Sequence, residues 1–136
     1  AYLIDVPGGR TITLRGHRGE VNGLRFDPSG EVLATSSDDG TLRIWALPDG
    51  RLVATLVVTD AGQWVVFTPD GYLDGSVNGR WLVQYAVGDD WFPWTVGWPR
   101  FGVPGLLGRI LSGDGTFRLL ALRRLVAKSK AARTPR

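Results

Sequence analysis

The feature that most constrains the fold is a segment that recurs after 41 residues. Phe-Asp-Pro-Ser-Gly at 26–30 recurs as Phe-Thr-Pro-Asp-Gly at 67–71. Residues 4–10 align with residues 45–51 at the same shift, sharing a proline, a glycine and an arginine. A period of this size indicates a repeat architecture in which each copy is one supersecondary unit.

Within each copy, short apolar segments alternate with turn signals, which predicts strands joined by tight hairpins. Pro28 in Asp-Pro-Ser-Gly favours a type I turn, and Gly40 after two aspartates supplies the positive φ of a hairpin. Four strands per copy suit a propeller blade, so the predicted fold class is all-β. The expected strands cover residues 21–26, 31–36, 41–45 and 51–58 in the first copy, and 63–67, 72–76 and 81–87 in the second.

The first copy resembles one WD40 repeat, with Gly16-His17 before its first strand and Ile44-Trp45 in its third. The resemblance implies a partial WD40 β-propeller of about two blades. The expected division is the end of a preceding blade at 1–14, a WD40 blade at 15–58, a degenerate terminal blade at 59–90, and an aromatic-rich segment with a basic helical tail at 91–136. Ala46 stands where the family has aspartate, and the second copy has Tyr85 and no Gly-His.

The segment from Trp64 to Ser76 resembles the last blade of bacterial WD40 proteins, which often carry a caspase-like peptidase or a signalling domain upstream. Propellers use about four to eight blades, and each blade needs neighbours to cover its faces. We therefore expect the chain to be a fragment or to assemble with other copies.

In the WD40 family, one His, one Ser or Thr, one Asp and one Trp form a hydrogen-bonded set inside a regular blade. The resemblance places this set at His17, Thr35, Asp39 and Trp45. Buried carboxylates and ring N–H groups need partners, so a structural role is favoured. A catalytic His17–Asp39 relay is the alternative, but it would need a nucleophile, and Thr35 is expected in mid-strand.

Composition limits the chemistry. There is no cysteine and His17 is the only histidine, which excludes cysteine-based and multi-histidine metal centres. No nucleophile elbow, phosphate-binding loop or EF-hand loop is present. We expect no enzyme activity, no cofactor and no metal. The absence of cysteine fits a reducing compartment, so the expected location is cytoplasmic.

Charge is divided unevenly, with 7 basic and 12 acidic residues in 1–99 but 9 basic residues and one acid in 100–136. The tail allows an alternative function, binding of an anionic ligand or nucleic acid, although nucleic acid is the less favoured partner. Helices are expected at 104–111 and 117–132. The basic tail comprises Arg118, Arg123, Arg124, Lys128 and Lys130.

Five aromatic residues lie within residues 91–101. They form either a plug that packs over a blade or a platform that binds a peptide.

The predicted function is a non-catalytic scaffold for protein–protein interaction, because loops on a rigid framework commonly carry binding residues. The partner is an unidentified protein, and self-association is a further possibility. No stretch of about 20 apolar residues predicts a membrane span. Besides the scaffold and the binding of an anionic ligand or nucleic acid, a third possible function is the regulatory end of a larger enzyme such as a caspase-like peptidase. The partner-contact candidates are Arg15, Arg18, Glu20 and Asp38.

Overall fold

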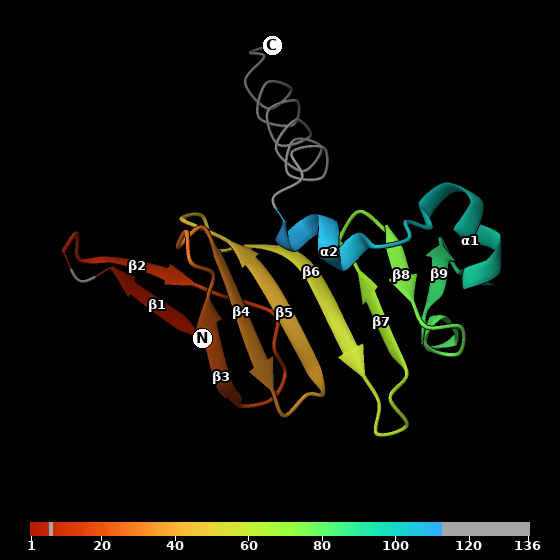
Figure 1. The fold of residues 1–136 in the computed structure, drawn as a ribbon, viewed down its shortest axis with the longest axis horizontal. Coiled ribbons are helices and arrows are strands. Elements are labelled where there is room, and N and C mark those ends of the chain that lie inside the picture. Colours follow the sequence, from red (N-terminus) through yellow and green to blue (C-terminus); the bar gives the residue numbers. More distant parts are fainter. Residues whose placement is uncertain (6, 113–136) are drawn as a thin grey trace, which may run out of the picture. The chain divides into compact units, whose positions relative to one another are not determined.

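The computed structural model describes residues 1–5 and 7–112 (Figure 1). The chain divides into two units, Ala1–Pro104 and Gly105–Arg136, and each is considered by itself. Antiparallel strands make up most of the regular structure of the first unit, so the predicted all-β fold is confirmed.

The chain begins with a two-stranded ribbon of β1 (Tyr2–Asp5) and β2 (Arg10–Thr13). Gly9 closes its turn with φ +63°, a conformation that L side chains rarely adopt. The amide of Leu14 donates to the carbonyl of Ala1 at 2.9 Å, extending the pairing by one residue.

A six-stranded antiparallel sheet follows, with its strands ordered as they occur in the sequence (Figure 1). The strands expected in the first copy are present, with ends that differ by at most one residue. Hairpin turns join them, and Gly40 has φ +78° in the turn between the second and third strands. The strands are β3 (Val21–Phe26), β4 (Val32–Ser37), β5 (Thr41–Ala46), β6 (Arg51–Val58), β7 (Trp64–Phe67) and β8 (Leu73–Gly75).

The sheet continues across residue 58, where the repeat predicts a change from one blade to the next. β6 pairs with β7 from Thr55↔Phe67 to Val58↔Trp64. At the corresponding point of the first copy, β2 and β3 belong to different sheets. His17 aligns with Val58 at the 41-residue shift. The loop of His17 leaves the ribbon and turns inward, whereas Val58 continues its strand into a tight hairpin.

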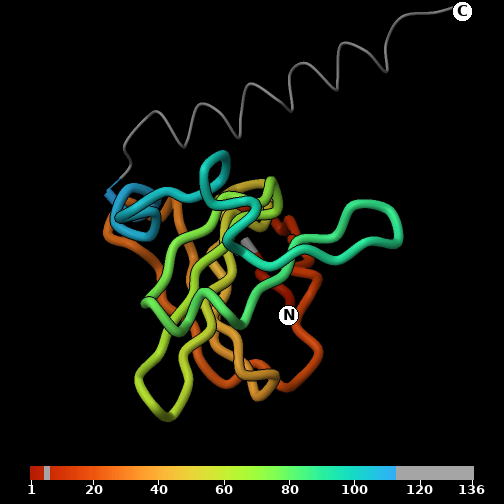
Figure 2. Tube along the Cα trace, turned by 90° about the vertical axis from the view of Figure 1, so that its right-hand side faces the viewer, coloured from red at the N-terminus to blue at the C-terminus, as the bar shows by residue number. Residues whose placement is uncertain are grey.

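The expected strand at 81–87 is wrong in its first part, which belongs to the 3₁₀-helix η1 (Gly79–Leu82). The Gly79 amide donates to Ser76 Oγ at 3.1 Å, and a Cβ on Gly79 would overlap the Trp64 carbonyl. This close approach turns the backbone out of the sheet. Strand pairing resumes in β9 (Gln84–Val87), which forms a hairpin with β10 (Asp90–Pro93). Figure 2 shows this hairpin projecting from the body of the first unit.

The aromatic-rich segment forms β10 and the helix α1 (Trp94–Phe101), neither of which was expected. The β9–β10 hairpin crosses the division expected at residue 90, and the division of the chain stays a prediction. After α1, the Val103 amide donates to the Leu73 carbonyl at 2.9 Å, and Gly102 forms a parallel bridge with Leu73. The chain thereby returns along the free edge of β8.

The second unit contains the helix α2 (Leu106–Leu111), which confirms the helix expected at 104–111. Gly105 precedes it with φ +75°. The helix expected at 117–132 and all five basic-tail residues lie outside the described residues.

A hydrophobic core joins the ribbon to the sheet. Its buried members are Ile12 and Leu14 from the ribbon side and Leu33 and Trp45 from β4 and β5. Trp45 is only 1% exposed. Burying such side chains stabilises the fold by about 1.5–3 kcal/mol each. This core fixes the position from which the loop of His17 departs.

Candidate functional site

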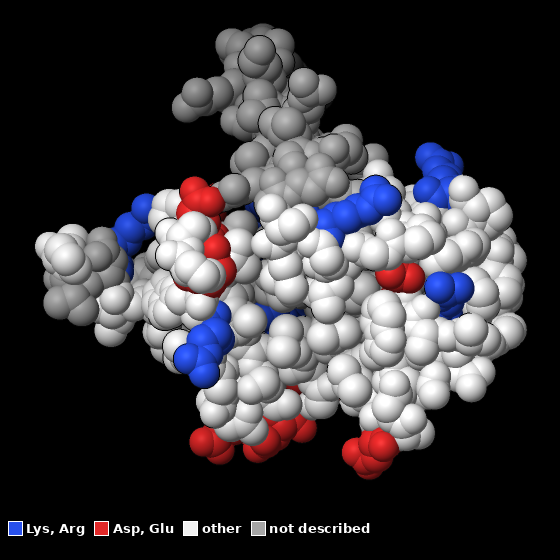
Figure 3. Space-filling model, viewed as in Figure 1, with Lys and Arg blue, Asp and Glu red and all other residues white. Residues whose placement is uncertain are grey.

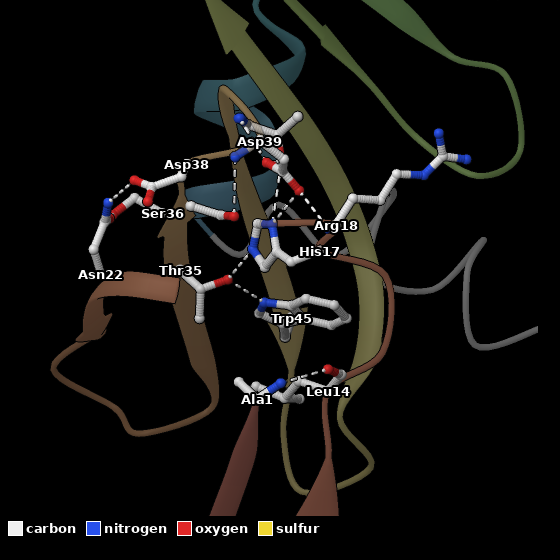
Figure 4. A network of polar contacts seen from close by, with 12 residues as sticks. Ala1, Leu14, His17, Arg18, Asn22, Thr35, Ser36, Asp38, Asp39 and Trp45 are labelled. Carbon is white, nitrogen blue, oxygen red and sulfur yellow. Dashed lines mark hydrogen bonds and ion pairs between the residues drawn. The ribbon is translucent and has the colours of Figure 1, made fainter. Parts of the chain in front are cut away.

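Four residues from four segments meet beside the core (Figure 4). His17 lies in the loop between β2 and β3, Thr35 on β4, Asp39 in the β4–β5 turn and Trp45 on β5. The structure brings together the whole set that the sequence singled out. These four residues, with the β2–β3 loop that carries His17 and the β4–β5 turn that carries Asp39, are called the His17 network below.

Hydrogen bonds connect the four side chains in series. His17 Nδ1 lies 3.0 Å from Asp39 Oδ2, and His17 Nε2 lies 2.8 Å from Thr35 Oγ1. The Trp45 indole N–H donates to the same Thr35 oxygen at 2.8 Å. The His17 and Trp45 rings meet edge to face with centroids 6.2 Å apart. The series satisfies polar groups that would be costly to bury unpaired.

One proton assignment satisfies every contact in the series. Thr35 accepts from the Trp45 indole and donates its own proton to His17 Nε2. His17 then carries its proton on Nδ1 and donates it to Asp39. The Asp39 carboxylate thereby fixes the orientation of the His17 ring.

Asp39 is the most heavily hydrogen-bonded group of the network. Burial raises the pKa of its carboxyl, but hydrogen bonds from the Thr41 hydroxyl, the Arg18 amide and His17 outweigh burial and hold that pKa well below its ordinary value. Thr41 Oγ1 lies 2.6 Å and the Arg18 amide nitrogen 2.9 Å from the carboxylate. Asp39 is therefore charged at neutral pH and pins the loop of Arg18 to the turn.

The geometry gives the network no reacting atom that a substrate can reach. Thr35 is 2% exposed, and its hydroxyl is engaged by both rings. The His17 side chain is 4% exposed. A catalytic relay needs a nucleophile free to meet substrate, so this arrangement suits a structural role. Within the described residues, no group of three or more His, Cys, Asp or Glu side chains could hold a metal ion.

The partner-contact candidates lie around this network. Arg15, Arg18, Glu20 and Asp38 are all exposed. The Asp38 amide donates to the Glu20 carbonyl at 3.0 Å, so the loop and the turn lie side by side. Figure 4 shows the Arg18 side chain extending away from the network. These four residues on the paired loop and turn are called the rim below.

Sequence reasoning missed three residues of this region. Thr41 binds Asp39 through both its hydroxyl and its amide, the latter at 2.9 Å. Asn22 donates to Asp38 at 2.6 Å and accepts from Ser36 at 3.1 Å. Thr41 follows directly after the Asp-Gly turn, where a hydroxyl can reach back to the aspartate, and that spacing was an available signal.

The aromatic side chains of α1 mostly pack within the first unit. Trp94 contacts Trp81 and Trp98 edge to face, each with centroids 5.6 Å apart. The Arg80 guanidinium lies 4.0 Å from the Trp98 ring centroid. Trp91, by contrast, is 71% exposed on β10. The contacts of α1 favour the plug over the platform.

Tyr85 joins the hairpin to this packing. Its ring stacks on Phe101 with centroids 5.6 Å apart, and its hydroxyl donates to the Gly71 carbonyl at 3.2 Å. Burial raises the pKa of the Tyr85 hydroxyl.

Comparison with protein families identifies the repeat. Residues 8–46 match the family described as WD domain, G-beta repeat. The match includes all four residues of the His17 network.

Curated relatives share longer segments. The ribosome biogenesis protein ERB1 of Yarrowia lipolytica is 56% identical over 86 residues, covering 56% of this chain and 10% of that protein. An uncharacterized WD repeat-containing protein of Synechocystis is 41% identical over 76 residues, covering 52% of this chain and 22% of that protein. The ribosome biogenesis protein BOP1 homolog of Drosophila virilis is 33% identical over 91 residues, covering 64% of this chain and 12% of that protein.

The chain thus spans between about a tenth and about a fifth of the length of these relatives. Among the described residues, no helix is both long enough and apolar enough to span a membrane. The family match, the strand order and the hydrogen-bonded set agree. Residues 8–46 thus match a WD40 repeat, and the described residues have an all-β fold that is consistent with a partial WD40 propeller.

Proposed function

We propose that this chain is a non-catalytic scaffold that binds a partner protein through the rim. The observation that carries the proposal is the double attachment of the rim: Asp39 holds the Arg18 amide, and Asp38 holds the Glu20 carbonyl. A surface ordered before binding loses less conformational entropy when a partner docks. Arg15 and Arg18 beside Glu20 and Asp38 present both signs of charge, which favours selection of a charged, complementary surface.

The relatives support a role in assembly. Two of them are named for ribosome biogenesis, and their matched segments cover 56% and 64% of this chain. For this chain, we infer only that the scaffold brings proteins together. The cysteine-free composition fits a cytoplasmic setting, and the cyanobacterial relative fits the bacterial origin that the Trp64–Ser76 resemblance implies.

The test is alanine substitution of all four rim residues in the protein as it occurs in its source cell. Proteins that co-purify with wild type are quantified against those that co-purify with the variant. A matched control replaces Asp49 and Arg25, which are exposed but lie outside the rim. We expect loss of at least one partner with the rim variant and retention with the control. Equal retention by both variants contradicts the proposal.

The alternatives have less support. The basic tail lies outside the described residues, and on the face shown in Figure 3 the basic side chains stand apart instead of forming one patch. Nucleic-acid binding usually needs a continuous basic surface. The regulatory end of a larger enzyme such as a caspase-like peptidase is the third candidate, and it rests on the resemblance of the Trp64–Ser76 segment alone. Self-association is a further proposal, because a partial propeller leaves blade faces for neighbours to cover.

A further inference from the structure

Arg43 lies on β5 beside the His17 network. It pairs with Thr35 on β4, and residues that pair directly across two strands point to the same face of the sheet. The Arg43 guanidinium reaches Gly16, the residue before His17, where an added Cβ would overlap Nη1 of the arginine. Arg43 therefore contacts the loop that carries part of the rim.

The guanidinium of Arg43 is packed at its inner end and unpartnered at its outer end. The residue is half-buried, and its Nε is buried without a hydrogen-bond partner. The two terminal nitrogens make no hydrogen bond or ion pair with any described residue, and neither is a buried unpartnered atom. The Gly16 amide likewise donates to no described group. A guanidinium held in this way fits an oxyanion that accepts two parallel hydrogen bonds.

The charges around Arg43 favour an anion with a single charge. Arg15 and Arg18 lie on the same loop, no more than about 10 Å apart along the chain, and neither forms an ion pair with a described residue. Glu20 and Asp38 lie on the same rim and repel a doubly charged phosphate more strongly than a carboxylate. The side chain of an aspartate or glutamate therefore suits the site best.

We propose that the terminal nitrogens of Arg43 bind an Asp or Glu carboxylate in the segment of the partner protein that docks on the rim. The proposal rests on the scaffold function above and names the chemistry of the partner. Arginine is enriched among the few interface residues that dominate affinity. The His17 network already holds the loop, so little conformational entropy is lost when the carboxylate binds.

Two matched peptides test the site on the isotope-labelled full chain. The probes are acetyl-Ala-Ala-Glu-Ala-Ala-amide and the same peptide with Gln in place of Glu, and inorganic phosphate is the third probe. NMR follows the amides of residues 15–18 and the Arg43 Nε–H signal, which is assigned by its loss in Arg43→Lys. Arg25→Lys is the matched control, because Arg25 is exposed on β3. Thermal unfolding measures whether both variants are folded.

We expect the Glu peptide to shift the Arg43 signal saturably, and the Gln peptide and phosphate to bind at least about 5-fold more weakly. Arg43→Lys keeps the charge but loses the planar fork, so it should weaken binding of the Glu peptide about 10-fold, measured at the amides of residues 15–18. Arg25→Lys should leave the affinity within about 2-fold of wild type. No saturable shift, equal affinity for the Gln peptide, tighter binding of phosphate, or unchanged affinity in Arg43→Lys would overturn the proposal.

Co-purification separates this proposal from the scaffold function. If the alanine variant of the rim loses a partner that Arg43→Lys retains, the Arg43 site is overturned and the scaffold function stands. If Arg43→Lys loses the Glu peptide while the rim variant retains every partner, the carboxylate site stands and the scaffold function is overturned.

Discussion

His17 and Asp39 are 22 residues apart in the sequence, yet His17 Nδ1 lies 3.0 Å from Asp39 Oδ2. This contact joins the loop that leaves the β1–β2 ribbon to the turn between β4 and β5. Because the ribbon and the turn belong to different sheets, the contact ties together parts that no backbone ladder connects. The rim owes its shape to this attachment.

Replacing Asp39 should destabilise the fold. Asp39→Ala leaves the imidazole of His17 and the amide of Arg18 without their acceptor, which costs about 1–3 kcal/mol of unfolding free energy. The neighbouring Asp38 provides a matched control because it is exposed and binds only through Asn22 and the Glu20 carbonyl. Asp38→Ala should cost about 0.5 kcal/mol or less. Urea unfolding measures the free energy of unfolding of both variants. Equal losses of stability in the two variants would contradict a special role for Asp39.

Acid should weaken the network in a predictable direction. The pKa of Asp39 is lowered in the folded state, so its contribution to stability is present above the ordinary pKa of 3.8 and is lost as pH falls from there through the folded value. We expect wild type to lose more stability than Asp39→Asn between about pH 5 and about pH 3. Urea unfolding at both pH values measures the difference. The pKa of Asp27 is also lowered, chiefly by the hydrogen bond from the Ser29 side chain. Asp27 is present in both proteins, so its contribution to the loss of stability cancels in the comparison. Parallel losses in the two proteins would contradict this account.

The sequence predicted the blade well because its strand ends are set by local turn chemistry. Asp-Pro-Ser-Gly and Ser-Asp-Asp-Gly form turns without help from distant residues, and Arg51–Val58 is the predicted strand without any shift. The His17 network was also within reach, since a repeat family fixes its spacing. The pairing of β6 with β7 could not be predicted from the sequence. It depends on whether the segment between two blades turns inward, as it does at His17, or continues as a strand, as it does at Val58.

The end of the first unit was harder to predict, for a different reason. Residues 81–87 are apolar enough for a strand, but the backbone approach of Gly79 to Trp64 starts a 3₁₀-helix instead. That approach is a tertiary contact and leaves no local pattern. Likewise, α1 contains Pro99 and Gly97, which lower helix propensity, and forms where its aromatic rings meet Arg80 and Tyr85.

Gly97 should be intolerant of a side chain despite lying in a helix. Replacing glycine by alanine in a helix usually stabilises by up to about 1 kcal/mol. A Cβ on Gly97 would overlap the Tyr85 ring, so Gly97→Ala should instead destabilise by about 1–3 kcal/mol. Gly108 in α2 is the matched control, because a Cβ there meets no atom within 4 Å. Thermal unfolding measures the stability of both variants. A Gly97→Ala variant more stable than wild type would show that α1 does not pack on Tyr85.

The rim's role as the partner surface is tested most directly by hydrogen–deuterium exchange on the protein in complex with a partner that co-purifies with it. We expect the partner to slow exchange at residues 15–20 and 37–40, with no change in the turn at 47–50. The Arg18 amide, already bound to Asp39, should be slow in the free protein too, and should become fast in Asp39→Ala. Protection by the partner confined to segments away from 15–20 and 37–40 would contradict the account.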